Sequence, residues 1–459
     1  MNTNGILRRH WLCVALLLGA TAAALAQSAA DWPTYLHDAR RTGISSAAIE
    51  PAGMEPLWCY RSPAPLRPAW PGPAPRDMYN SPTVDNEDRL DIDSVMQVAV
   101  VGQSVLFGSS VEDSLKCLDI SDGSSRWVFT ADGPVRFAPH VVDDRAYFGS
   151  DDGHVYCVST VDGGLLWDYR AALSDYQVPS DGKMVSLWPN RSGVVVHEGT
   201  VYSGAGVFPA EGAVVCALDA ATGADTGEGR YRQRHADMSL QGYVLASDRN
   251  VYFPGGRSGP WVFSRLSGER FGQIGGGGGT YAVVTGDESV IYGPGKTSAV
   301  LEEFGGDKRD RLATFPGGKQ IIIAGGTAYV NTRGTLLCLD RARHLELSRQ
   351  IVAKSEQIRK LKAGTEEHSE LSGEIADLQA EREECLRWQA ESPEAGAMIM
   401  AGEYLVTGGV GLVAAYRAQD GRRVWSAEVD GTAKGLAAAA GRIFVSTDAS
   451  LIYCFGPRP

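Results

Sequence analysis

The chain has 459 residues, with 55 glycines, 22 prolines and 44% apolar residues, a composition typical of a turn-rich all-β protein. Its formal net charge of −12 argues against a nucleic-acid partner, because such partners need clustered positive charge. Length alone would suggest two or three domains, but a closed array of repeats can hold as many residues in one. Internal repeats therefore decide the domain organisation.

The first 26 residues have the pattern of a cleavable export signal. A short basic region is followed by an apolar stretch and by Ala24-Leu25-Ala26, which form an A-x-A cleavage site. The apolar stretch is too short for a membrane span, and Cys13 lacks the small residues that precede a lipidated cysteine. We therefore expect residues 1–26 to be removed and residues 27–459 to fold in the periplasm or outside the cell.

Two neighbouring segments match each other at a spacing of 40 residues. Cys117 and Trp127 in the first segment correspond to Cys157 and Trp167 in the second, and an Asp-Gly turn precedes each tryptophan. Each segment has three β-runs in which apolar and polar residues tend to alternate, as half-buried strands require. A period near 40 residues with several strands per unit is typical of a β-propeller blade.

The unit recurs with drift along the rest of the chain. Further paired β-runs begin near residues 201, 251, 290, 328, 404 and 443, and the unit near residue 290 is the most degenerate. The last unit lacks a fourth strand, whereas residues 55–60 read as a strand with no unit before them. Pairing these two regions would close the ring and remove its open edges. The sequence therefore predicts an eight-bladed β-propeller closed by its N- and C-terminal strands, with seven blades as the alternative.

Two positions of the repeat hold residues that suit packing. The first holds Cys117, Cys157, Cys338 and Cys454, where other units have alanine or valine, and buried cysteine behaves as a small apolar residue. The second holds Trp58, Trp127, Trp167, Trp388 and Trp425, which we interpret as packing between blades. No C-x-x-C or Cys-Cys pair occurs.

Residues 341–387 differ from the rest in composition. They are rich in Glu, Lys, Arg, Leu and Gln, contain no proline, and repeat apolar residues at helical spacing on either side of Ala363-Gly364. This pattern predicts two helices that form an antiparallel coiled-coil hairpin, inserted where other blades have only an Asp-Gly turn. Both a tolerated insertion and an arm for docking or dimerisation are consistent with it.

The sequence contains no catalytic or metal-binding motif that we recognise. The five glycines 275–279 do not form G-x-G-x-x-G, because Thr280 follows them, and a β-run rather than a helix comes next. Neither H-E-x-x-H nor G-x-S-x-G occurs. No catalytic residue and no metal ligand are predicted.

Several polar residues share a position at the start of the predicted innermost strands. Alignment of the units places Arg136, Arg191, Gln241 and Tyr281 together, with Trp188 just before Arg191 and with Lys319 and Lys434 one place further along. A ring of hydrogen-bond donors around the channel would suit an anion or a carboxylate-rich ligand. The alternative is that these residues are polar because they end loops.

The units at residues 149–157 and 216–223, together with residues 31–43, resemble the repeat of the pyrroloquinoline-quinone (PQQ) propellers, and residues 186–193 and 241–243 resemble the PQQ-binding-like propellers of exported bacterial proteins. The resemblance covers nearly the whole chain apart from the predicted hairpin. It implies a propeller fold. In the dehydrogenases of this family it also implies bound PQQ, calcium held by Glu, Asn and Asp, a catalytic Asp and a vicinal Cys pair. This sequence has no such pair, and we can map no calcium triad onto it.

Taken together, these patterns predict a non-catalytic exported propeller that acts as a binding or scaffold protein without a cofactor. Its partner would be a protein or a small anionic ligand at the channel mouth, with no nucleic acid and no membrane span, and the helical hairpin would offer a second surface. The alternative function is a PQQ-dependent dehydrogenase of degenerate type, which would need PQQ and calcium.

Overall fold

The computed structural model describes residues 30–70, 90–294, 300–306, 309–332, 334–393 and 397–458. The predicted export signal lies outside the described residues. Among the residues that are described, no helix is both long and apolar enough to cross a membrane.

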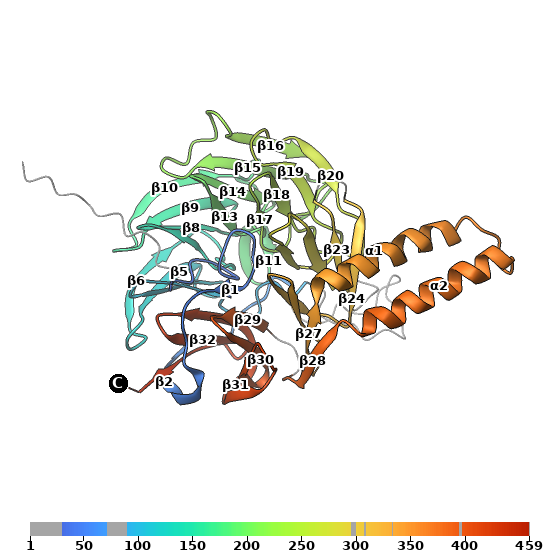
Figure 1. Ribbon diagram of the computed structural model, residues 1–459. Helices are drawn as coiled ribbons and strands as arrows, with labels where there is room; N and C mark the ends of the chain where they lie inside the picture. The colour runs from blue at the N-terminus through green and yellow to red at the C-terminus, as the bar shows by residue number, and fades with distance from the viewer. Residues whose placement is uncertain are drawn as a thin grey trace, which may run out of the picture.

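Six antiparallel four-stranded sheets lie around a common centre in the arrangement of a β-propeller (Figure 1). The first two contain β3 (Val98–Val101), β4 (Ser104–Ser109), β5 (Ser114–Asp119) and β6 (Ser125–Thr130), then β7 (His140–Val142), β8 (Arg145–Gly149), β9 (His154–Ser159) and β10 (Leu165–Arg170). The third and fourth contain β13 (Val194–His197), β14 (Thr200–Ala205), β15 (Ala213–Asp219) and β16 (Tyr231–His235), then β17 (Leu245–Ala246), β18 (Asn250–Phe253), β19 (Trp261–Ser264) and β20 (Arg270–Gln273). The fifth and sixth contain β21 (Tyr281–Val284), β22 (Val290–Gly293), β23 (Val300–Phe304) and β24 (Arg311–Pro316), then β25 (Gln320–Ala324), β26 (Thr327–Asn331), β27 (Thr335–Asp340) and β28 (Leu386–Glu391).

A seven-stranded sheet joins the two ends of the described chain. Its order is β1 (Ile44–Ser45), β29 (Ala397–Ala401), β30 (Tyr404–Arg417), β31 (Arg423–Ala439), β32 (Arg442–Thr447), β33 (Leu451–Pro457) and β2 (Met54–Arg61). The antiparallel pairing of β2 with β33 confirms the strand pairing predicted between the two ends. The short helix η1 (Pro51–Gly53) precedes β2, and the separate two-stranded hairpin β11 (Gln177–Ser180) and β12 (Lys183–Ser186) follows β10.

The strand register reproduces the repeat seen in the sequence. Cys117 lies opposite Trp127 in one sheet, and Cys157, Cys338 and Cys454 lie opposite Trp167, Trp388 and Trp58 in others. All four cysteines are buried and free. Inner strands such as β4 are buried throughout because neighbouring sheets cover both faces, whereas the outer strand β6 is mostly exposed. A continuous apolar run and a mixed run therefore alternate within each unit.

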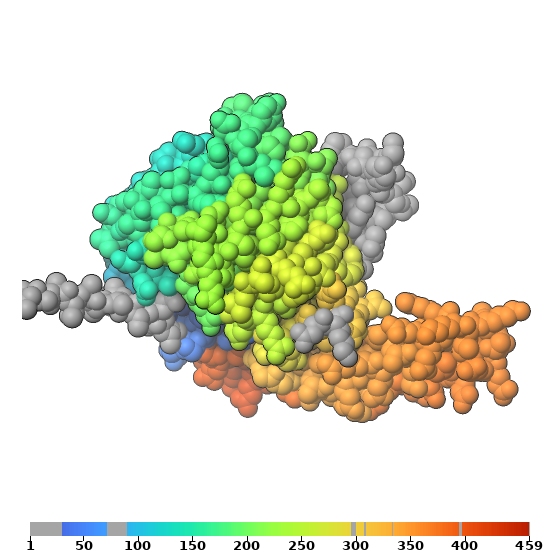
Figure 2. All heavy atoms as spheres, turned by 90° about the horizontal axis from the view of Figure 1, so that it is seen from above, coloured from blue at the N-terminus to red at the C-terminus, as the bar shows by residue number. Residues whose placement is uncertain are grey.

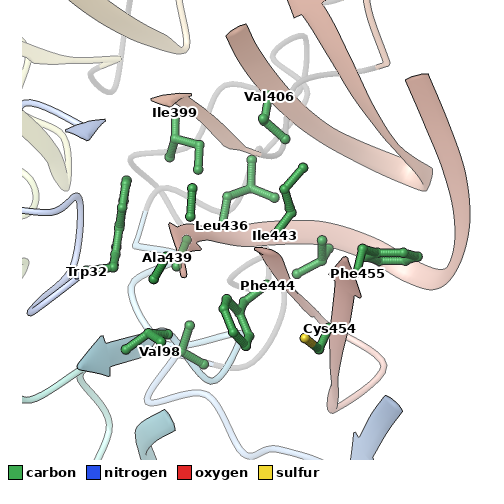
Figure 3. Packing of buried hydrophobic residues seen from close by; sticks show 14 of the residues in the cluster. Trp32, Val98, Ile399, Val406, Leu436, Ala439, Ile443, Phe444, Cys454 and Phe455 are labelled. Atoms are coloured by element: carbon green, nitrogen blue, oxygen red, sulfur yellow. The ribbon is translucent and has the colours of Figure 1, made fainter. Parts of the chain in front are cut away.

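The largest part of the core lies where the two ends of the chain meet. Trp32 packs there with Val98 of β3, Ile399 of β29 and Phe444 of β32, as Figure 3 shows. Phe455 of β33 belongs to the same cluster. The cluster thus buries together residues from the start of the described chain, from β3 and from the last sheet. Closure of the ring therefore removes apolar surface from water as well as pairing strands.

The repeated tryptophans join neighbouring sheets, as the sequence predicted. Four indole Nε1 groups donate a hydrogen bond to a backbone oxygen of the next sheet, at 2.9 Å from Trp58 to Ile120, 3.0 Å from Trp127 to Thr160, 3.1 Å from Trp167 to Ala220 and 3.2 Å from Trp388 to Ala418. Trp425 Nε1 donates at 3.0 Å to the carbonyl oxygen of Met54, between β31 and β2 of the seven-stranded sheet. A glycine of the next sheet faces the ring in the first four of these contacts, namely Gly123, Gly163, Gly223 and Gly421. The Trp-Gly pair is the recurring contact between sheets.

We expect Gly163→Ala to destabilise the protein by about 2–4 kcal/mol. Gly163 has φ +75°, and a Cβ there would lie 2.7 Å from the Trp127 ring. Gly102→Ala is the matched control, because Gly102 has φ +56° but no atom within 4 Å of an added Cβ, so only the backbone cost of about 1 kcal/mol applies. Urea unfolding of both variants measures the difference. Equal losses would show that the Trp-Gly contact adds nothing.

Two helices, α1 (Arg341–Ile358) and α2 (Glu366–Glu383), lie between β27 and β28. Asp340 and Thr365 cap their N-termini through hydrogen bonds from the backbone N–H groups of Arg343 and His368. The helices form a hairpin that projects away from the sheets (Figures 1 and 2). The hairpin is shorter than predicted, because Leu386 and Arg387 belong to β28, where Leu386 pairs with Leu339.

Candidate functional site

The predicted donor position lies at one end of the propeller. Strands β3, β7, β13, β17 and β21 contact one another in series at the centre of the ring. They enter it in the same direction, because each begins a sheet of four antiparallel strands. Residues just before these strands therefore gather at one end, here called the mouth. The turns between first and second strands, and between third and fourth strands, lie at the opposite end.

Arg136 and Arg191 meet at the mouth around one buried carboxylate. Asp151, which follows β8, has no exposed surface and accepts hydrogen bonds from Arg136 Nε at 2.7 Å and from Arg191 Nε and Nη2 at 3.2 and 3.1 Å. Both arginine side chains are only 5% exposed. Burial would raise the pKa of Asp151, but Arg191 and Arg136 together lower it. The carboxylate is thus held ionised between two guanidinium groups.

A second carboxylate comes from the connection between β2 and β3. Asp93 accepts a 2.7 Å hydrogen bond from Arg136 Nη1 and a 2.9 Å bond from the backbone N–H of Ala69. Arg136 Nη1 also donates to the carbonyl oxygen of Arg67 at 2.8 Å. Burial raises the pKa of Asp93, and Arg136 opposes this rise. Arg67 and Ala69, near the start of this connection, and Asp93, near its end, are therefore joined at the mouth by hydrogen bonds.

Trp70 covers Arg191 from the same connection. The Arg191 guanidinium lies 5.7 Å from the centre of the Trp70 ring, and Trp70 Nε1 donates a 2.8 Å hydrogen bond to Gln241 Oε1. Gln241 Nε2 in turn donates to Ser239 Oγ. Trp70 is 37% exposed, so one side of its ring faces solvent. Three of the predicted donors, Arg136, Arg191 and Gln241, thus form one cluster with Trp70 and two aspartates.

The other predicted residues lie outside this cluster. Lys434 pairs at 2.6 Å with Asp91, which also lies in the connection between β2 and β3. Tyr281 Oη donates to the carbonyl oxygen of Ile321 at 2.7 Å, which joins β21 to β25. Trp188 is buried and donates from Nε1 to the Glu211 carbonyl oxygen at 3.1 Å. Burial lowers the pKa of the half-buried Lys319. These residues do not share a ligand position with Arg136.

The opposite end of the channel is filled by residues 30–45. Their backbone bonds to one inner strand after another, at Val100, Val141, Ala246, Val284 and Met400. Arg41, which is 1% exposed, donates to the carbonyl oxygens of Val194 and Val244. Tyr35 stacks on Tyr243 at 3.8 Å in the middle of the channel. The described chain therefore occupies its own channel from both ends.

Sequence reasoning did not single out Asp93, Trp70 or Arg41 as site residues, since they lie outside the repeated units. Asp151 stands in Asp151-Asp152-Gly153, a sequence that by itself indicates a turn. The available signal was a carboxylate directly after the fully buried end of β8, since a buried charge requires a partner. The matching signal for its partner was a pair of arginines, Arg136 and Arg191, at the equivalent position of successive units.

The mouth residues do not fit the calcium that a quinoprotein dehydrogenase would need. The described residues contain no group of three or more His, Cys, Asp or Glu placed to hold a metal ion. Asp93 and Asp151 face Arg136 and Arg191, so a cation between them would also face two guanidinium groups. An acidic quinone would need the donors that these aspartates already engage. The cluster is electrostatically complete without either group.

The family model described as outer membrane protein assembly factor BamB, a model of PQQ-like repeats, matches residues 83–344 and 372–455. The gap between the two matched ranges falls within the α1–α2 hairpin. A comparison with curated protein sequences found no match.

Solved structures with a similar fold include two quinohemoprotein alcohol dehydrogenases. The enzyme from Comamonas testosteroni has a TM-score of 0.60 and 12% identity, covering 95% of this chain and 82% of its own. ADHIIG from Pseudomonas putida HK5 has a TM-score of 0.57 and 10% identity, covering 94% and 80%. A europium-containing methanol dehydrogenase has a TM-score of 0.56 and 10% identity, covering 94% and 98%. At these identities the likeness shows the fold alone.

Proposed function

Because the chain belongs to the family of PQQ-like repeats whose model is described as outer membrane protein assembly factor BamB, we propose that it is a non-catalytic, exported propeller that binds or scaffolds a protein partner. The observation that carries this proposal is the mouth cluster. Arg136 pairs with Asp151 and Asp93 of the same chain, and Arg191 pairs with Asp151. The position at which a propeller of this kind would hold a ligand is therefore built as a closed, neutral structural unit.

The proposal includes eight blades. The pairing within the seven-stranded sheet supports a division into two units of four strands. β29 pairs with residues 404–408 of β30, and residues 412–416 of β30 pair with residues 423–428 of β31. Residues 433–439 of β31 then pair with β32, which pairs with β33 and, through it, β2. Each half contains the strands of one blade, with β1 as an extra edge strand.

Exposed apolar side chains at the mouth support a protein partner. Tyr176 and Met184, which flank or lie on the β11–β12 hairpin, are 61% and 52% exposed, and Phe208, in the turn between β14 and β15, is 45% exposed. Two hydrogen bonds join this region, one from the Leu187 N–H to the Tyr176 carbonyl oxygen and one from the Trp188 side-chain Nε1 to the Glu211 carbonyl oxygen. Exposed apolar groups near a rigid cluster are typical of contact surfaces. The donors at the mouth, Arg136, Arg191 and Gln241, would then hold this surface in place instead of binding a free anion.

The proposal is tested by adding PQQ and calcium to the purified protein. We expect no quinone absorption to remain with the protein after gel filtration and no dye reduction with alcohols or sugars. The variant Asp93→Asn is the matched control. It removes the carboxylate that pairs with Arg136 Nη1, and it therefore tests whether PQQ is excluded only because that donor is already engaged. A bound quinone with substrate-dependent dye reduction in the unmodified protein would overturn the proposal in favour of a degenerate PQQ-dependent dehydrogenase.

The binding role is tested with photo-crosslinking residues introduced in the producing cell. Substitution at Tyr176 and Phe208 probes the mouth, and substitution at Val161 and Leu266, which are 70% and 64% exposed in turns at the opposite end, serves as the control. We expect one discrete protein adduct from the mouth positions alone. Adducts of equal yield from both ends, or none from the mouth, would contradict a partner-binding mouth.

A further inference from the structure

We propose that Lys183 is the residue that positions the contact surface at the mouth. It holds the β11–β12 hairpin against the first sheet, so that Tyr176 and Met184 are presented to the partner in a fixed place. The inference rests on the proposed binding function and deepens it, because it names what keeps the contact surface in position. Lys183 acts through the hairpin and not by touching the partner, so it is a positioning residue.

The β11–β12 hairpin needs contacts from outside to keep its position. It is a two-stranded sheet separate from the sheets of the propeller, and the side chains of Gln177–Ser180 are exposed or half-buried. A two-stranded hairpin by itself is only marginally stable in water. Its base is joined to the mouth by a 2.7 Å hydrogen bond from the Ser186 N–H to the Asp151 carbonyl oxygen. The turn at residues 181–182 is left to be held by side chains.

Lys183 makes this contact beside the turn. Its Nζ donates to the carbonyl oxygens of Ser110 at 3.0 Å and Val111 at 2.8 Å, and to Asp113 Oδ1 at 2.5 Å. All three acceptors belong to the turn between β4 and β5 and lie 70 to 73 positions earlier in the chain. An ammonium group has three N–H donors, so this turn engages all of them. The side chain of Lys183 is accordingly only 21% exposed.

The residues held in this way include the exposed apolar groups of the mouth. Met184 follows Lys183 in β12, and Tyr176 immediately precedes β11. The connection that contains them is joined to the third sheet by the bond from Trp188 Nε1 to the Glu211 carbonyl oxygen. Lys183 joins the same connection to the first sheet. The hairpin is therefore fixed from two sides, and its exposed side chains are in place before any partner arrives.

The edges of the hairpin do not favour addition of a strand from the partner. Pro179 in β11 has no N–H group, and the Ser186 N–H in β12 is already bonded to Asp151. Each edge therefore lacks a donor that strand addition would use. Contact through side chains depends on where those side chains stand, and a surface fixed before binding loses little further entropy when the partner binds. Without Lys183 that ordering cost falls on the binding step.

The variant Lys183→Met tests this inference in the photo-crosslinking cells. We expect the yield of partner adduct from the probes at Tyr176 and Phe208 to fall about 10-fold, because the hairpin is no longer fixed before binding. In the purified variant, hydrogen exchange followed by mass spectrometry should be faster within residues 177–186. The urea unfolding midpoint should stay that of the unmodified protein, since the hairpin lies outside the propeller sheets.

Lys354→Met is the matched control. Lys354 is 30% exposed and pairs with Glu374 at 2.6 Å, so the variant removes the same charge from a comparable ion pair, but on the α1–α2 hairpin. It should change neither the adducts nor the exchange of residues 177–186. Lys183→Arg keeps a charged donor that reaches the same turn and should recover at least about half of the adduct yield.

Asp113→Asn shows whether Lys183 acts through this turn. Asn is suited to the φ of +51° at this position and removes only the charge of the acceptor. It should lower the adduct yield in the same direction as Lys183→Met. The double variant should bind no worse than Lys183→Met alone, because the two residues act through one contact. Losses that simply multiply would contradict a joint role.

Adducts that persist in Lys183→Met would overturn this inference and leave the proposed binding function standing. Adducts that fall only together with the urea midpoint would also overturn it, since Lys183 would then serve the stability of the whole propeller. If the unmodified protein gives no adduct from the mouth, both the inference and the proposed function fail. The three results are distinguishable because the unmodified protein is measured beside each variant.

Discussion

Replacing Asp151 by Asn should lower the free energy of unfolding by about 3–5 kcal/mol, the cost of leaving buried charges without their partner. The amide keeps the shape of the carboxylate but leaves Arg136 and Arg191 facing a neutral group, with only Asp93 to balance them. Urea unfolding at neutral pH, followed by tryptophan fluorescence, measures the loss. Asp168→Asn is the control, because Asp168 is 46% exposed and pairs with His154. This substitution should cost less than about 1 kcal/mol.

The stability lost in Asp151→Asn should also depend on pH. The folded-state pKa of Asp151 lies below its ordinary value of 3.8, because Arg191 and Arg136 outweigh the effect of burial. A group whose pKa is lowered on folding stabilises the fold above the unfolded value and loses that contribution as the pH falls through the folded value. The gap in stability between the unmodified protein and Asp151→Asn should therefore stay constant above about pH 5 and narrow below 3.8. A gap independent of pH down to acid unfolding would contradict an ionised Asp151.

Replacing Arg41 by Met should destabilise the protein by about 3–5 kcal/mol, since several buried acceptors lose their donor together. Arg41 donates to Thr34 Oγ1 and to the carbonyl oxygen of Tyr35, both at 2.9 Å, as well as to Val194 and Val244. Burial lowers its pKa to about 10, so it is still charged at neutral pH. Methionine fills similar space and shares the backbone strain of φ +61°, so the loss reports the hydrogen bonds.

Arg40→Met is the matched control for this prediction. Arg40 is the adjacent residue, and its side chain is 22% exposed and pairs with Asp248 and Glu288 near the surface. We expect it to cost about 1 kcal/mol or less. Limited proteolysis provides a second measurement, since the Arg41 variant should be cut within residues 30–45 much faster than the control. Equal unfolding midpoints for the two variants would mean that Arg41 does not hold this segment.

The repeat made most of the fold predictable. Trp127 and Cys117 recur at a fixed spacing because each sheet solves the same packing problem against its neighbour, so one position demands an indole and another a small apolar group. The unit near residue 290 appeared degenerate, yet β21 to β24 form a complete sheet, because backbone hydrogen bonds tolerate the loss of side-chain signatures. Helical spacing predicted α1 and α2, but the predicted hairpin also included Leu386 and Arg387, which begin β28. The spacing of apolar residues alone does not show where a helix ends.

The site was less predictable for a physical reason. Arg136, Arg191 and Gln241 could be aligned because they occupy equivalent positions, and the structure brings these three together. Asp93 and Trp70 lie in a connection that is repeated nowhere, and their contacts are made through space with residues more than 40 positions away. Tyr281 shares the aligned position but bonds to Ile321, because a phenol reaches a different neighbour than a guanidinium does. Equivalent positions thus did not mean equivalent roles.

The pairing of β2 with β33 also constrains the order in which the molecule can be assembled. The bond between Leu66 N–H and Ser450 Oγ beside this pair joins residues 384 positions apart, so nearly the whole polypeptide must be delivered before the contact can exist. During synthesis of the chain, β2 emerges early and stays an unpaired edge until the last strand arrives. Such a long closure carries an entropic cost and slows folding. The early-emerging edge is therefore the segment that would most need a chaperone.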